Sequence, residues 1–108
     1  MAEEEGTNIP SGADITGTIK FDKIMRIDGN FEGELITDNG DLVVGKTGSI
    51  KANIRIRRAI IEGRVDGDIK ASEKVEIRPK AQIKGNLQTK ELIIEEGVSF
   101  TGKCKVNP

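Results

Sequence analysis

The sequence predicts an all-β protein, a single-domain solenoid in which a triangular coil of roughly 17 residues repeats five to six times. Two observations carry this prediction. Apolar and polar residues alternate along short segments, as in strands with one buried face, and the alternating unit returns at a constant interval. The second apolar residue of the unit recurs after 17, 17, 16 and 17 residues, at Ile27, Val44, Ile61, Ile77 and Ile94. So regular a period indicates a repeat architecture, and the alternation by two excludes a helical repeat.

Residues 1–14 differ in composition from the repeat. They carry four acidic residues and no basic one, and Gly, Pro and Ser interrupt them, so they are predicted to be a disordered acidic tail. Residues 15–108 carry a net charge of +3. We therefore assign the β-helix domain to residues 15–106 and the C-terminal end to residues 107–108. The first copy of the repeat is truncated and consists of Ile15, Gly17 and Ile19.

Turn signals mark the corners of the coils. Asp38-Asn39-Gly40 combines residues that tolerate positive φ, and Pro79 stands where a corner needs no amide donor. The apolar residues that flank a corner are four apart from Ile27 to Phe31 but six apart from Val44 to Ile50. Corner length is therefore predicted to vary from coil to coil.

The repeat runs to Val106, and no polar segment follows it in this sequence. Because solenoids normally need polar caps, we expect the last coil to present an unpaired strand edge and a slice of apolar core, which is a template for association. Cys104 occupies an inward position of this coil and is interpreted as a small buried hydrophobe. A single cysteine and the lack of a signal peptide or long apolar run predict a cytoplasmic protein with a reduced thiol.

Two segments resemble enzyme motifs. Residues 40–47 match the phosphate-binding pattern G-x-x-x-x-G-K-[ST], but Leu42 and Val44 are ladder positions and the next segment is another strand instead of a helix. The six-residue spacing of Val44 and Ile50 resembles hexapeptide acyltransferases, which rely on a His base, and this sequence has no His. We expect a non-enzyme without cofactor or metal, with nucleotide binding and acyl transfer as minor alternatives.

Four basic residues stand in a stretch without any acid, and they form a candidate face for an anionic partner: Lys51, Arg55, Arg57 and Arg58. Lipid headgroups, nucleic acid or a glycan would supply the anion. The favoured alternative is an outward face neutralised by acids of adjacent coils, such as Glu62 or Glu76. We do not expect a nucleic-acid partner, because no aromatic residue is interleaved with the basic ones for base stacking.

Several coils together resemble the bactofilins, bacterial polymer-forming cytoskeletal proteins. The similar segments are IDGNFEG (27–33), IEGRVDGDI (61–69), the coil at 75–87 and the closing coil at 92–104, which ends in VSFTGKC. The resemblance covers residues 15–106 and implies a right-handed triangular β-helix that polymerises end to end into nonpolar filaments without nucleotide. It also implies a role in cell shape and in recruiting cell-wall enzymes.

The resemblance further implies a polymer interface made of apolar residues in the terminal coils. In this sequence these are Val98, Phe100, Cys104 and Val106 at one end and Ile15, Ile19 and Phe21 at the other. Many members carry an apolar N-terminal membrane-targeting segment, and the acidic residues 1–14 depart from that pattern. Any position at the inner face of the cell membrane is therefore expected to be reached through partner proteins. The alternative role is a β-helical adaptor that does not polymerise.

Overall fold

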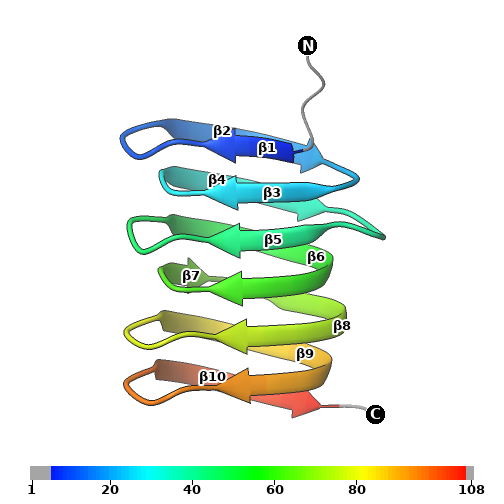
Figure 1. The fold of residues 1–108 in the computed structure, drawn as a ribbon, viewed down its shortest axis with the longest axis vertical. Coiled ribbons are helices and arrows are strands. Elements are labelled where there is room, and N and C mark those ends of the chain that lie inside the picture. Colours follow the sequence, from blue (N-terminus) through cyan, green and yellow to red (C-terminus); the bar gives the residue numbers. More distant parts are fainter. Residues whose placement is uncertain (1–5, 107–108) are drawn as a thin grey trace.

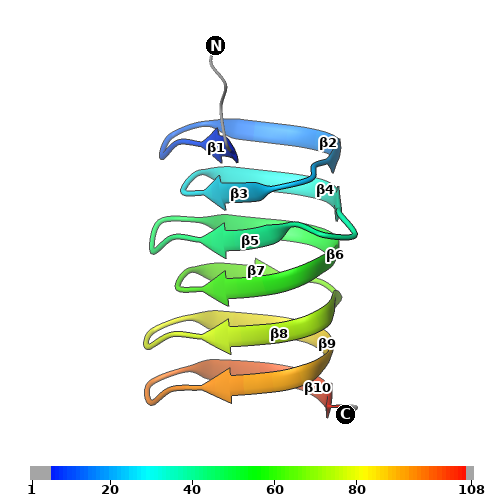
Figure 2. The ribbon, with the colours of Figure 1, turned by 45° about the vertical axis from the view of Figure 1, so that its right-hand side comes forward.

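The computed structural model describes residues 6–106, and strands make up all the regular structure of this part of the chain. The strands wind into one right-handed solenoid (Figures 1 and 2). They are β1 (Gly6–Ile9), β2 (Asp14–Lys20), β3 (Ile24–Ile27), β4 (Asn30–Ile36), β5 (Asp41–Val44), β6 (Ser49–Ile61), β7 (Arg64–Asp66), β8 (Ile69–Ile77), β9 (Gln82–Ile94) and β10 (Ser99–Val106).

Each coil has three sides, and every side is a parallel ladder in which a segment pairs with the coils before and after it. The first side stacks residues 6–9, 24–27, 41–44, 58–61, 74–77 and 91–94. The second side stacks residues 14–16, 30–32, 49–51, 64–66, 82–84 and 99–101. The third side stacks residues 18–20, 34–36, 53–55, 68–70, 86–88 and 103–105. The predicted fold class and period are confirmed.

The corner between the second and third sides is a column of glycines with a left-handed backbone. Gly17, Gly33, Gly67, Gly85 and Gly102 have φ between 135° and 141°. Each of these glycines that stacks on a preceding coil also leaves no room for a side chain. A Cβ on Gly85, for example, would collide with the carbonyl oxygen of Gly67. Ala52 takes the place of glycine in one coil and pairs in register with Gly33. The glycines of the repeat are therefore required by both backbone conformation and close stacking.

The corner between the first and second sides varies in length, as the sequence predicts. It is short at 28–29 and 62–63 and longer at 10–13, 45–48, 78–81 and 95–98, so long and short loops are visible along one edge of Figure 1. The inward residues of the first side form two buried columns, one through Met25 and Leu42 and one through Ile27 and Val44. Ile27, Val44, Ile61 and Ile77 are all 0% exposed.

The predicted start of the solenoid is wrong. Gly6–Ile9 forms β1 and pairs with β3, so the first coil begins at least nine residues before Ile15. Ile9 stacks over Ile27 and is only 4% exposed, and its carbonyl accepts a hydrogen bond from the Asp28 amide at 2.8 Å. One apolar residue in a polar stretch is enough to continue the column. Of the predicted tail, residues 1–5 lie outside the described residues, as does the predicted C-terminal end, 107–108.

Candidate assembly surfaces

The C-terminal coil presents its inward residues at the end of the solenoid, because no further described coil lies over them. Ile94 continues the column of Ile77, yet Ile94 is 49% exposed while Ile77 is 0% exposed. Val106 is 47% exposed in the same way. We call this apolar surface the C-terminal face: Leu92, Ile94, Val98, Phe100, Cys104 and Val106.

Phe100 lies near the start of β10 and stacks in register on Ile83 of the coil before it. The ring is partly buried and packs against the core, together with Leu92 and Val98. The fold therefore covers the Phe100 side chain on the side of Ile83, and no described coil covers it on the opposite side. The interface predicted from the sequence includes Val98, Phe100, Cys104 and Val106. Leu92 and Ile94 belong to the same face but were not part of that prediction.

Cys104 holds the inward ladder position over Leu87, but it is exposed. The prediction that it is buried is wrong, because no described coil lies over the inward positions of the C-terminal coil. The partial desolvation that remains raises the pKa of the thiol above its ordinary value.

The N-terminal coil presents a second apolar surface, which we call the N-terminal face: Ile15, Ile19 and Phe21. Ile15 is 39% exposed and stacks in register on the buried Phe31. Ile19 and Phe21 are partly buried and pack against the core. The structure thus separates the seven predicted interface residues into two groups at opposite ends of the solenoid (Figure 1).

The strand edges at both ends also lack a partner among the described residues. β10 pairs only with β9, and β2 pairs only with β4. Successive strands of a sheet lie about 4.8 Å apart and bond through backbone groups, so an edge strand carries unused donors and acceptors. Each end therefore combines an apolar surface with a free ladder edge.

The predicted anionic-partner face is divided among different sides. On the second side Lys51 lies in register between Glu32 and Asp66. Arg57, at the next corner, forms ion pairs of 3.1 Å with both Asp41 and Glu73. Arg55 lies on the third side and stacks on another cation, Lys70.

Arg58 completes the ion-pair cluster on the first side, with its guanidinium 2.6 Å from Glu73. The hydrogen bond and charge of Arg58 lower the pKa of the Glu73 carboxyl, and the same contact raises the pKa of Arg58. The favoured alternative of neutralisation by adjacent coils thus describes Arg57 and Arg58, although the acids are Asp41 and Glu73 instead of Glu62 and Glu76.

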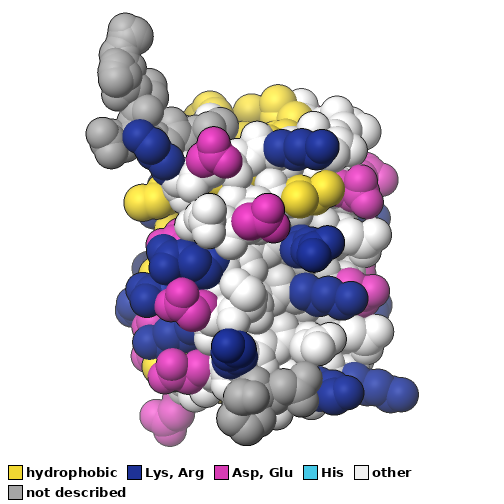
Figure 3. Space-filling view, turned by 90° about the vertical axis from the view of Figure 1, so that its right-hand side faces the viewer, with side chains coloured by type: hydrophobic (Ala, Val, Ile, Leu, Met, Phe, Trp, Pro, Cys, Tyr) yellow, Lys and Arg dark blue, Asp and Glu magenta, His cyan; other side chains and the backbone are white. Residues whose placement is uncertain are grey.

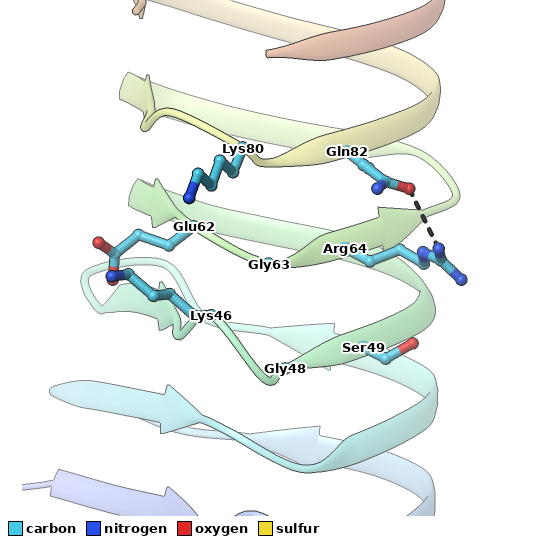
Figure 4. Close-up of a pocket in the computed structure, with 8 residues that line it drawn as sticks. All are labelled: Lys46, Gly48, Ser49, Glu62, Gly63, Arg64, Lys80 and Gln82. Carbon is cyan, nitrogen blue, oxygen red and sulfur yellow. Dashed lines mark hydrogen bonds between the residues drawn. The ribbon is translucent and has the colours of Figure 1, made fainter. Parts of the chain in front are cut away.

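The phosphate-binding pattern at 40–47 forms no phosphate cradle. Leu42 and Val44 are buried in β5, and the Gly45 amide already donates to the Ile27 carbonyl at 2.9 Å. Lys46 instead lines an open hollow of about 250 Å³ at the corner, where a short turn lies between two long ones (Figure 4). The hollow also contains Glu62 and Lys80, so its charges are mixed. No group of metal-ligating side chains occurs within residues 6–106.

No helix among the described residues is long and apolar enough to cross a membrane.

Comparisons with known proteins agree on one family. The family model described as "Bactofilin: Polymer-forming cytoskeletal" matches residues 7–105. Bactofilin BacP of Myxococcus xanthus is 36% identical over 89 residues, which are 82% of this chain and 37% of BacP. Bactofilin BacO of the same organism is 34% identical over 101 residues, which are 94% of this chain and 79% of BacO. The chain therefore spans little more than a third of BacP.

Two solved structures have the same fold. The cryo-EM reconstruction of Thermus thermophilus bactofilin double helical filaments aligns with a TM-score of 0.87 and 28% identity, over 94% of this chain and 99% of that one. The bactofilin BacA structure from solid-state NMR aligns with a TM-score of 0.85 and 23% identity, over 97% and 99%.

Proposed function

This chain belongs to the bactofilins, the polymer-forming cytoskeletal family, and from that premise we propose that it is a structural protein that assembles end to end into nonpolar filaments without nucleotide. The observation that carries the proposal is the pair of apolar faces at opposite ends of a solenoid whose interior is otherwise closed. Burying these faces against other copies removes apolar area from water and pairs the free strand edges.

The charges of the last coil favour contact between two C-terminal faces. Its first side and the adjoining corner carry Glu91, Glu95 and Glu96, whereas its third side carries Lys103 and Lys105. A two-fold axis that runs in the plane of the face and through the second side exchanges the first and third sides. Each protomer's acidic side would then lie over the partner's basic side, which makes the face complementary to itself.

In the cell such filaments would scaffold cell shape and localise cell-wall machinery. They would lie in the cytoplasm, and partner proteins would hold them at the inner face of the membrane. The chain itself would supply no catalysis and use no cofactor. The second candidate, a β-helical adaptor that does not polymerise, has the same fold and differs only in what covers the end faces.

Negative-stain microscopy of the purified chain without nucleotide tests polymerisation. Filaments are expected, whereas a protein that remains monomeric at high concentration would support the adaptor. The substitution Lys46→Ala should leave the filaments unchanged. Specific binding of ATP or GTP that is lost in Lys46→Ala would overturn the nucleotide-independent mechanism.

The single cysteine tests whether like ends meet. Cys104 is exposed on the C-terminal face, and the chain has no other cysteine. In a nonpolar filament two copies of Cys104 share each C-terminal contact, so a short flexible bismaleimide should convert the chain to covalent dimers and to nothing larger. In a polar filament Cys104 faces an end without cysteine, and filaments that yield no dimer would contradict the nonpolar arrangement. Cys104→Ser is the control.

A further inference from the structure

The third side of the solenoid carries a line of cations that the end-to-end assembly does not use. One outward column of this side consists of Lys20, Ile36, Arg55, Lys70, Gln88 and Lys105, in order along the axis. Four of these six are basic, and none is acidic. We call Lys20, Arg55, Lys70 and Lys105 the basic stripe. On this face Figure 3 shows Lys and Arg side chains at intervals from one end of the molecule to the other, with hydrophobic and uncharged side chains between some of them.

Three cations of the basic stripe lack an acidic partner in the described structure. Arg55 pairs in register with Lys70, so two like charges lie one strand spacing apart. Within residues 6–106, no carboxylate lies within 4.0 Å of Arg55, Lys70 or Lys105. Like charges on neighbouring strands destabilise a sheet. The other sides are different, since Lys51 lies between two acids and Arg58 is paired.

The stripe is narrow, because acids lie on both sides of it. The neighbouring outward column of the third side contains Glu34 and Asp68. The corner beyond the stripe contains Asp38 and Glu73, both outside the column. A flat anionic bilayer laid on this side would press against these carboxylates as well as the cations. Single-stranded nucleic acid would want aromatic stacking partners, and none stands in the outward columns of this side.

Two shallow hollows flank the stripe at its C-terminal half. One, of about 250 Å³, is lined by Arg55, Lys70, Gln88 and residues of the adjoining corner. The other, of about 310 Å³, lies on the opposite side and is lined by Lys70, Gln88, Lys103 and Lys105 among others. Side chains of an occupant that follows the stripe have space on either side of Lys70, and the Gln88 amide can bond a peptide group.

We propose that the basic stripe is a docking site for an acidic, extended segment of a partner protein. From Lys20 to Lys105 the column spans five strand spacings, or about 24 Å, which an extended peptide of about seven residues covers. Carboxylates on such a segment supply the charges that the stripe lacks. The inference names a partner chemistry for the proposed scaffold, but peptide binding can be measured whether or not the chain forms filaments, so the two can fail separately.

The test uses the full chain and a fluorescein-labelled heptaglutamate peptide, with anisotropy as the readout. The variant is Arg55→Gln with Lys70→Gln, and the matched control is Lys51→Gln with Lys84→Gln, which removes the same charge from the second side. We expect the first variant to weaken binding about tenfold and the control about twofold or less, with salt weakening the wild type. Circular dichroism should show that both variants are folded. The first variant removes a repulsion between neighbouring strands, and the control changes only exposed side chains.

Equal loss in the two variants would reduce the effect to net charge and overturn the proposal, as would no binding of heptaglutamate to the wild type. Vesicles containing phosphatidylglycerol and a labelled oligothymidine are measured in parallel. If either binds more tightly than heptaglutamate and is lost only in Arg55→Gln with Lys70→Gln, the stripe serves a lipid surface or a nucleic acid, and the acidic-segment proposal is wrong. If the vesicles and the oligothymidine both bind weakly, and to the same extent in the two variants, the acidic-segment proposal is supported.

Discussion

The middle and the ends of this solenoid are built from the same ladder but have opposite surface properties. Ile61 and Ile77 have a coil on either side and are 0% exposed, whereas Ile94, in the same column, is 49% exposed. The residue type is identical in all three coils, so the difference comes only from position in the stack. The same apolar column therefore stabilises the fold in the middle and supplies a surface for association at the end.

The largest effect expected from this comparison is on the free energy of unfolding. Ile77→Ala leaves a cavity in a fully buried column and should destabilise the chain by about 2–5 kcal/mol. Ile94→Ala removes a half-exposed side chain and should cost about 1 kcal/mol or less. Urea unfolding followed by circular dichroism, at a concentration below that of assembly, measures both. Equal losses would mean that the last coil is covered in the unassembled protein.

A smaller difference is expected at the glycine corner. Gly85→Ala and Gly17→Ala both place a side chain at φ near +140°, a backbone region that costs a non-glycine residue about 1–3 kcal/mol. Only at Gly85 does the new Cβ also meet a carbonyl oxygen, that of Gly67, while Gly17 has nothing within 4 Å. Gly85→Ala should therefore lower the thermal midpoint clearly more than Gly17→Ala. The reverse order would show that the N-terminal coil is packed against something outside residues 6–106.

The smallest effect concerns the ion pairs on the outside of the middle coils. Arg58 lowers the pKa of Glu73 below its ordinary value, so the folded state binds this proton less readily than the unfolded state does. The contribution is complete above the ordinary glutamate pKa and is lost as pH falls through the lowered value. Stability measured from neutral to acidic pH should fall less steeply in Glu73→Gln than in the wild type. Parallel curves would assign the cluster no role.

The sequence alone predicts the fold well, because a period of 17 residues and alternation by two act together on every coil. The variable length of the corner was also predictable from the sequence. The spacing from Ile27 to Phe31 differs from that between Val44 and Ile50, and the structure has a short and a long turn there. The first strand escaped detection because Gly6–Ile9 carries one large apolar residue and lies in an acidic, turn-rich stretch. The acidic, turn-rich composition led to the prediction of a disordered tail, although Ile9 occupies a ladder position.

The sites were harder to predict, since they depend on which residues of different coils share a register. Lys51, Arg55 and Arg57 are close in sequence, yet they lie on the second side, the third side and the next corner. Lys70 is 15 residues beyond Arg55 and stacks directly on it. Coils of unequal length shift the register, so such columns become visible only when every corner length is known. The prediction that Cys104 is buried was wrong for a related reason. Alternation shows that a side chain points inward, but it does not show whether another coil lies over that side chain.

If the exposed end of the apolar core holds the filament together, Phe100→Arg should prevent assembly. Burial of Phe100 against another copy would contribute roughly 1.5–3 kcal/mol at each contact, and an arginine there must instead lose its hydration. The Phe100→Arg protein should keep its circular dichroism spectrum and sediment as dimers at most, because only contacts between N-terminal faces remain. Asn53→Arg adds the same charge to a middle coil and should leave filaments intact. Filaments of normal length from folded Phe100→Arg protein would contradict assembly through the ends and move the interface to the sides of the solenoid.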